Sequence, residues 1–182
     1  MMFKRFKVIS ATLLTMLFSV FLCSSFAQNN VKPDLFKALK YRHIGPTGNR
    51  VVAIIGEPGN TNVIYAVGAT GGVWKSENAG ITWKPLFDEQ DVQTIGSLAL
   101  APSDSNIIWC GTGEAKIRQG VSIGIGIYRS IDAGKTWQCM GLEKSGRISR
   151  ILIHPTNPDI VFAGSLGHCW GSQKERGVFR TK

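Results

Sequence analysis

The chain has 182 residues, with 21 lysines and arginines against 12 aspartates and glutamates, so its formal net charge is +9. These basic residues are scattered along the sequence instead of gathered on one element, which argues against nucleic-acid binding. The spacing of Cys110, Cys139 and Cys169 matches neither a zinc site nor a dense disulfide framework. We therefore expect no metal and no cofactor.

The first segment has the layout of a secretory signal peptide. A basic start precedes an uncharged apolar run over Val8–Phe21, and small residues stand at Ser25 and Ala27, the positions that a signal peptidase reads. The alternative is a transmembrane anchor, but Ser and Thr interrupt the run and no basic stop follows it. We expect cleavage that removes residues 1–27, leaving a lead-in segment over 28–49. The predicted location is periplasmic, cell-surface or extracellular, with no stable membrane span after cleavage.

Beyond the lead-in, short segments rich in Val, Ile, Tyr and Trp recur in three units, and each is bounded by Gly, Pro, Asn or Asp, as strands are. The first strand of each unit is predicted in "RVVAIIGE" from Arg50, "TIGSLALA" from Thr94 and "RISRILIH" from Arg147. The second strand follows a tight turn, in "PGNTNVIYAVG" from Pro58, "PSDSNIIWCGT" from Pro102 and "PTNPDIVFAGS" from Pro155.

The third strand of each unit comes after a longer loop, in "GVWKS" from Gly72, "GIYRS" from Gly126 and "GVFRT" from Gly177. In the first two units this strand enters nearly identical segments, "WKSENAGITW" and "YRSIDAGKTW", and a fourth strand follows. Four-stranded antiparallel units that repeat in this way suit the blades of a propeller better than a sandwich.

The sequence therefore predicts an all-β fold, namely an incomplete β-propeller of four-stranded antiparallel blades preceded by a signal peptide. The blades are expected at about 50–87, 94–142 and 147–182, so the partial propeller occupies 50–182. The third unit stops where its Ser-to-Trp turn should begin. Because propellers typically have four to eight blades, we expect two blades and most of a third here, and the rest from a longer chain.

The repeated ten-residue segments have the chemistry of a tight turn instead of a catalytic site. The short side chain of Asn78 or Asp132 accepts backbone N–H bonds across the turn, and Gly80 or Gly134 permits a positive φ. The threonine suits a strand start, and the tryptophan packs between neighbouring strands or blades. The structural residues predicted in this way are Ser76, Asn78, Gly80, Thr82, Trp83, Ser130, Asp132, Gly134, Thr136 and Trp137.

These residues carry a resemblance to a known family. Ser76–Trp83 and Ser130–Trp137 resemble the Asp-box, or bacterial neuraminidase (BNR) repeat, S-x-D-x-G-x-T-W; the second copy matches fully and the first has Asn78 for aspartate. Phrases such as "ILIHPTNPDIVFAGSLGHCWG" resemble exported bacterial proteins grouped with the sortilin N-terminal domain and with BNR glycosyl hydrolases. The resemblance implies a β-propeller. The activities it allows range from sialidases and xyloglucan-cleaving endoglucanases to sortilin-type receptors for polypeptides.

The meander predicts which face of the propeller binds. The first and third connections lie on one face, and the second connection and the links between blades lie on the opposite face, here called the loop face. The second connections of units two and three are extended, in "GEAKIRQGVSIG" (113–124) and "LGHCWGSQKERG" (166–177). Since binding groups usually lie on loops held by a rigid scaffold, we expect the ligand at the loop face.

The candidate binding residues of the loop face are Arg50, Arg118, Arg147, His168, Trp170 and Arg176. Arg50 and Arg147 precede an inner strand at equivalent positions, where two guanidiniums could hold a carboxylate or phosphate. The alternative is that they cap strand ends or pair with Glu114 and Asp91.

The aromatic and imidazole groups of the third unit also have two interpretations. Trp170 offers a stacking platform for a sugar ring, or it covers apolar surface of its own loop. His168 beside Cys169 lacks the spacing of a metal motif, so a hydrogen bond within the loop is expected.

Two functions remain open. One is a binding scaffold for a polypeptide or carbohydrate on the loop face. The other is a glycoside hydrolase, BNR-repeat and xyloglucanase-like, whose catalytic carboxylates lie largely beyond residue 182; Glu114 and Glu175 are weak catalytic candidates here, since surface carboxylates usually form salt bridges. A sialidase is not supported, because Tyr65 and Tyr128 fall within predicted strands. Whether the protein is an enzyme is left open.

Overall fold

The computed structural model describes residues 50–117 and 119–181, together with the single positions 34, 37, 39, 43 and 45. The chain divides into two units, 1–42 and 43–182. The strands of the described residues all belong to the second unit. The predicted signal peptide, at 1–27, and nearly all of the lead-in segment lie outside the described residues.

The first sheet is a four-stranded antiparallel meander of β1 to β4. Its strands are β1 (Val51–Glu57), β2 (Asn60–Gly68), β3 (Val73–Ser76) and β4 (Lys84–Pro85). The two long strands are rich in valine and isoleucine, and β4, with Pro85, is only two residues long. The sheet is therefore broad at β1 and β2 and narrows toward β4.

The second sheet repeats the first with the same strand order. Its strands are β5 (Ile95–Ala101), β6 (Asp104–Thr112), β7 (Ile127–Ser130) and β8 (Gln138–Cys139). The registers match as well, since Ile64 pairs with Ser76 in the first sheet and Ile108 pairs with Ser130 in the second. The sequence repeat is thus a repeat of the pairing in space.

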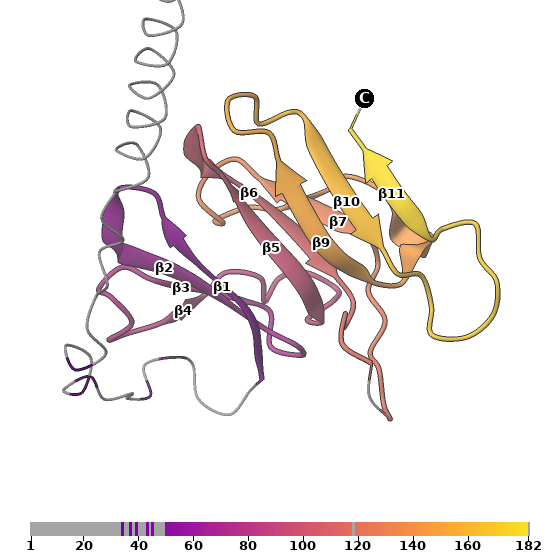
Figure 1. Cartoon of the computed structure of the whole chain (residues 1–182), viewed down its shortest axis with the longest axis horizontal. Helices are drawn as coiled ribbons and strands as arrows, with labels where there is room; N and C mark the ends of the chain where they lie inside the picture. The colour runs from indigo at the N-terminus through magenta and orange to yellow at the C-terminus, as the bar shows by residue number, and fades with distance from the viewer. Residues whose placement is uncertain are drawn as a thin grey trace, which may run out of the picture. The chain divides into compact units, whose positions relative to one another are not determined.

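The third sheet has three strands among the described residues, in the order β11, β10, β9. They are β9 (Ile148–Ile153), β10 (Val161–Ser165) and β11 (Gly177–Arg180), and a short 3-10 helix, η2 (Glu143–Ser145), precedes them. The first strands of the three sheets lie side by side, β1 against β5 and β5 against β9 (Figure 1). Three antiparallel sheets packed face to face through their first strands are the arrangement of propeller blades.

Hydrophobic side chains fill both interfaces between the blades. One buried cluster joins the first two sheets and includes Tyr65, Phe87 and Ile95; another joins the second and third sheets and includes Trp109 and Ile148. The close approach at the second interface needs glycine, because a Cβ at Gly111 would lie 2.5 Å from Ile148 Cγ2.

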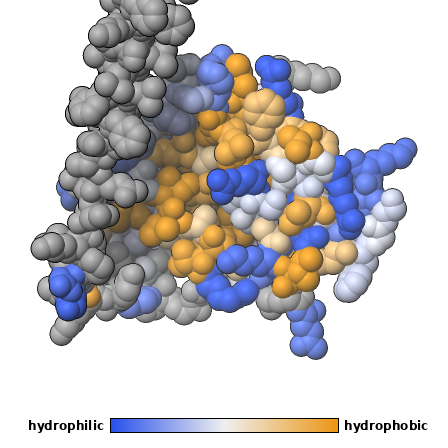
Figure 2. All heavy atoms as spheres, viewed as in Figure 1, coloured by the Kyte–Doolittle hydropathy of each residue, from blue (hydrophilic) through white to orange (hydrophobic). Residues whose placement is uncertain are grey.

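The inner strands carry an apolar surface of their own. Side chains of β1, β5 and β9 line a cavity of about 520 Å³, and Ile54 and Leu152 are more than half exposed there. Hydrophobic residues gather over this part of the molecule in Figure 2. In a closed propeller this wall would surround the central channel.

The two ends of the strands carry different connections, as the meander requires. At one end the Ser-to-Trp turns bond to the proline turns, since Ala79 N donates to Asn62 O at 2.8 Å and Ala133 N donates to Asn106 O at 2.9 Å. At the other end the second connections bond to the links between blades; Gly113 N donates to Thr94 O at 2.8 Å. This second end is the loop face.

Each Ser-to-Trp turn is closed by its own side chains. Ser76 Oγ accepts from Gly80 N at 2.8 Å and Asn78 Oδ1 accepts from Thr82 N at 2.8 Å. The second turn repeats both bonds, with Gly134 N to Ser130 Oγ at 2.8 Å and Thr136 N to Asp132 Oδ1 at 2.9 Å.

The backbone of these turns is left-handed at two successive residues. Gly80 and Gly134 have φ of 86° and 90°, and the alanines before them, Ala79 and Ala133, have φ of 54° and 59°. An alanine in this region is uncommon. The hydrogen bond from each alanine N to the neighbouring proline turn helps to hold it there.

Candidate functional site on the loop face

The extended loop of the second sheet is anchored at its base by Thr112. The Thr112 hydroxyl donates to Gly126 O at 2.6 Å and accepts from Ile125 N at 2.9 Å. A further bond, from Gly124 N to Gly146 O at 2.7 Å, ties the loop to the link between the second and third sheets. The loop is therefore fixed where it leaves the sheet.

The extended loop of the third sheet is closed by Gln173 and Ser165. Gln173 Oε1 accepts from His168 N at 2.7 Å, and Ser165 Oγ donates to the Glu175 carbonyl at 2.6 Å. The His168 ring packs on Gly146, where a Cβ would lie 3.2 Å from the ring atoms. These contacts hold the loop beside the one from the second sheet.

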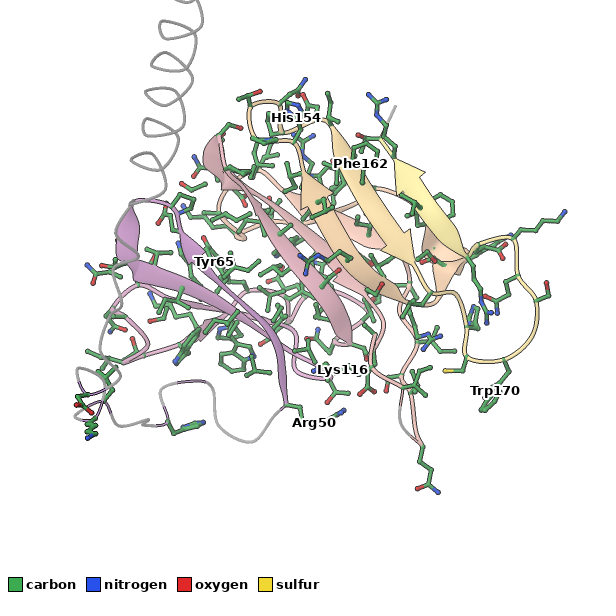
Figure 3. The ribbon with its side chains drawn as sticks, in the orientation of Figure 1. Arg50, Tyr65, Lys116, His154, Phe162 and Trp170 are labelled. Atoms are coloured by element: carbon green, nitrogen blue, oxygen red, sulfur yellow. The ribbon has the colours of Figure 1, made fainter. Side chains whose placement is uncertain are left out.

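A pocket of about 610 Å³ lies between the two extended loops. Both loops and the link between the blades contribute to its walls, which are formed by Ile117, Gln119, Gly120, Val121, Ile123, Arg147, His168, Cys169 and Trp170. Trp170 is 89% exposed and projects from the β10–β11 loop, at the same end of the molecule as Arg50 and Lys116 (Figure 3). An apolar wall with an exposed aromatic ring and few polar groups is typical of a small-molecule or sugar site.

Arg147 is the buried polar group of this pocket. Its side chain is almost fully covered, with the residue 3% exposed. Nε donates to Gly167 O at 2.7 Å and Nη2 donates to His168 O at 3.4 Å. Nη1 is buried and has no hydrogen-bond partner. The guanidinium is thus held in place by carbonyls on two sides and offers one nitrogen that the protein does not use.

Arg50 has a different environment from Arg147, although both precede an inner strand. Arg50 Nη2 lies 2.6 Å from Glu114 Oε1, and the Glu114 side chain is completely buried while that of Arg50 is half exposed. The ion pair joins the first blade to the second. The alternative of a pair with Glu114 is therefore confirmed for Arg50, while Arg147 bonds to backbone carbonyls, and the Glu114 side chain is buried.

The remaining candidates differ in their exposure. Arg176 is exposed, and its Nη2 donates to the His168 carbonyl at 2.8 Å, the same carbonyl that accepts from Arg147. Glu175 is half-buried, and its backbone carbonyl accepts from Ser165 Oγ at 2.6 Å. Arg118 lies outside the described residues.

Sequence reasoning did not single out the apolar wall of the pocket. Ile117 is 77% exposed and Ile123 is 54% exposed, although isoleucine normally avoids water. The signal was present as apolar residues inside a loop that is otherwise polar and glycine-rich, "GEAKIRQGVSIG". This signal is weak in a sequence, because isolated apolar residues in a loop can equally pack against the scaffold beneath it.

The described residues were also compared with the requirements of a metal site, a reactive thiol and a membrane-spanning helix. The structure groups no three His, Cys, Asp or Glu side chains there as a metal site, and Cys110, Cys139 and Cys169 are unpaired thiols. Burial raises the pKa of Cys110 far above its ordinary value, so this thiol is not a nucleophile. Over the same residues, no helix has the length and apolarity that a bilayer crossing requires.

The fold and the loop-face pocket define a class of protein, a β-propeller with its candidate site on the loops of one face. No protein-family model matches the chain. Among curated proteins, a xyloglucanase of Acetivibrio thermocellus, Xgh74A, is 28% identical over 135 residues, which cover 67% of this chain and 16% of the xyloglucanase.

Two solved structures share the fold. An ancestral GH74 enzyme matches with a TM-score of 0.56 and 22% identity, over 75% of this chain and 18% of the enzyme. The GH74 xyloglucanase from Xanthomonas campestris matches with a TM-score of 0.52 and 16% identity, over 74% of this chain and 19% of the enzyme. The chain thus spans less than a fifth of the length of these relatives, and the likeness establishes a β-propeller fold.

Proposed function

We propose that this chain forms part of an exported carbohydrate-binding β-propeller, and that the glycan binds in the loop-face pocket whose walls include Ile117, Val121, Ile123 and Trp170. The observation that carries the proposal is Trp170, which is 89% exposed beside a pocket with isoleucine walls. Sugar rings have apolar C–H faces that pack on aromatic rings, and exposing an indole so completely has a cost in water. The similarity to a xyloglucanase supports a glycan over a polypeptide.

Three finer features belong to the same proposal. The Ser-to-Trp turns are Asp-boxes of the BNR and sortilin-like kind, supported by their side-chain hydrogen bonds. Residues 1–27 are a signal peptide that directs export, supported by their tripartite sequence. Residues 28–49 are a lead-in, and the propeller begins near residue 50.

The proposal is tested by calorimetric titration of the full chain with xyloglucan oligosaccharides. Trp170→Ala should weaken binding by about tenfold or more, because the variant loses the stacking surface. Phe162→Ala is the matched control: Phe162 is an aromatic residue, 40% exposed, on β10 away from the pocket (Figure 3). Equal affinity of the Trp170→Ala variant and the wild type would contradict a glycan site here, and binding of peptides in place of glycans would favour the polypeptide ligand.

A glycoside hydrolase is the second candidate, because the curated relative is a xyloglucanase. Its carboxylates would lie largely outside the described residues, since Glu114 is buried in an ion pair. Glu175 is the remaining candidate on these loops. Release of reducing ends from xyloglucan, lost in Glu175→Gln, would support catalysis by this residue, whereas binding without release would support the scaffold.

A further inference from the structure

We propose that the loop-face pocket contains an anion subsite at Arg147, and that this subsite takes the carboxylate of an acidic sugar in the glycan. The inference rests on the proposed function, because it specifies which glycans the pocket holds. It also adds a preference for acidic glycans over neutral ones such as xyloglucan.

The first observation is the unused donor of Arg147. Carbonyl oxygens accept from Nε at 2.7 Å and from Nη2 at 3.4 Å, while Nη1 is buried without an acceptor. A buried N–H without a partner is destabilising, and more so when the group is charged. A ligand oxygen in the adjoining pocket would give Nη1 the acceptor that it lacks.

The second observation is the missing counter-charge. Over residues 50–117 and 119–181, no carboxylate forms an ion pair with Arg147, and none does so with Arg176. Both guanidiniums donate to the His168 carbonyl, so two positive charges meet at this end of the pocket. Buried charges in proteins are nearly always paired. By contrast, Arg50, at the equivalent position of the first blade, forms an ion pair with the carboxylate of Glu114.

The third observation is the pocket around the guanidinium. Ile117, Val121 and Ile123 line it together with the exposed Trp170. A pyranose ring with a carboxylate on C5 has an apolar face to lay on such a surface and an anionic group at its edge. Arginine binds a carboxylate through parallel N–H···O bonds, and a buried guanidinium held by carbonyls loses little freedom when it does so. Aromatic surface beside a single buried arginine therefore fits a uronic acid.

The test uses two ligands with the same sugar chain, one with charged carboxylates and one with neutral methyl esters in their place. The full chain is titrated with an oligogalacturonate and with the same oligosaccharide as its methyl ester, in matched buffer and salt. We expect the acid to bind about tenfold or more tightly than the ester, since a hydrogen bond to a charged group contributes about 1.5–3 kcal/mol. This comparison needs no variant, so it holds even where a substitution at Arg147 prevents folding.

Variants then assign the preference to Arg147. Arg147→Met should abolish the difference between acid and ester, and Arg147→Lys should keep part of it. Arg150→Met is the matched control: Arg150 lies on β9 and lines the inner-strand cavity, away from the loop-face pocket. This control should bind both ligands as the wild type does.

Each outcome has a separate meaning. Acid and ester bound equally, with both losing affinity in Trp170→Ala, would overturn the anion subsite and leave the proposed function standing. No binding of either ligand or of xyloglucan oligosaccharides would overturn both. Arg147-dependent binding of an acidic peptide such as oligo-aspartate, with no binding of the oligogalacturonate, would overturn the acidic sugar as the ligand.

Discussion

The two blade interfaces have homologous residues but differ in how completely they are filled. Between the first and second blades, Phe87 packs edge-on against Tyr128 and Trp137, with ring centroids 5.3 Å and 5.1 Å apart. Trp137 Nε1 also donates to Leu86 O at 2.8 Å. The position of Phe87 is taken by Gly141 at the interface of the second and third blades, where a cavity of about 370 Å³ remains.

The polar groups show the same difference. Tyr65 OH donates to Ala133 O across the first interface at 3.5 Å, whereas Trp109, the residue in the corresponding place on β6, has a buried Nε1 without a partner. The first interface also has the Arg50–Glu114 pair, in which the carboxylate is buried, and the second has the Arg129–Asp159 pair, in which the carboxylate is exposed. The partners at the first interface, Ala133 and Trp137, lie on the Ser-to-Trp turn of the second blade, whereas the described part of the third blade ends at residue 181, before its corresponding turn. The repeat thus specifies the same strands twice, and the Ser-to-Trp turn of one blade fills the interface with the blade before it.

The largest expected effect comes from emptying the first interface. Phe87 is fully buried, so Phe87→Ala should lower the free energy of unfolding by about 4 kcal/mol through lost transfer energy and a new cavity. Met140→Ala is the matched control at the second interface, because Met140 is 43% exposed beside a cavity that already exists. Urea unfolding of both variants measures the difference, and equal losses would contradict the contrast between the interfaces.

The two ion pairs give the second contrast. Arg50→Met removes a guanidinium from a completely buried carboxylate, and it should lower the free energy of unfolding by about 3 kcal/mol. Asp159→Asn breaks the pair with Arg129, in which the aspartate is 72% exposed. It should change the free energy of unfolding by less than about 1 kcal/mol.

Urea unfolding at neutral pH and moderate salt compares the two variants. Added salt should reduce the loss of unfolding free energy in Asp159→Asn. It should leave the loss in Arg50→Met nearly unchanged, because buried charges are poorly screened. An Arg50→Met variant as stable as the wild type would show that the buried pair contributes nothing to the interface.

The fold could be predicted because its signals are local. Turn residues such as Asn78, Gly80 and their second copies act within a few positions, and strand alternation needs no distant partner. Two blades of β1–β4 and β5–β8 follow from that pattern. The third sheet shows three strands in the described residues, up to β11 at Gly177–Arg180.

The candidate site was less predictable because it depends on tertiary contacts. Arg50 and Arg147 are equivalent in the sequence repeat, yet the carboxylate that faces Arg50 comes from the neighbouring blade, and among the described residues none faces Arg147. The sequence offered Glu114 as an alternative partner for both arginines, but it could not tell which of the two would meet it. The same holds for the pocket, whose isoleucines come from one loop and whose tryptophan comes from another.

The smallest expected effect concerns the two Ser-to-Trp turns at acid pH. Hydrogen bonds from Thr136, first its hydroxyl and then its backbone N–H, lower the pKa of Asp132 from 3.8 to about 2. Because the folded-state pKa is depressed, the stability that this carboxylate contributes is fully present above pH 4. It is lost as pH falls from about 4 to 2. Asn78 makes the corresponding bonds in the first turn, but an amide does not titrate there.

Exchanging the two residues isolates this contribution. Asp132→Asn should remove part of the loss of stability between pH 4 and pH 2, and Asn78→Asp should add a similar loss. Each change should stay under about 1 kcal/mol, because solvent screens a carboxylate at the surface. Urea unfolding at pH 7, 4 and 2.5 measures both. If the free energy of unfolding depends on pH in the same way in the wild type and both variants, the carboxylate adds nothing beyond the hydrogen bonds that asparagine already makes. The two turns would then be equivalent in stability as well as in geometry.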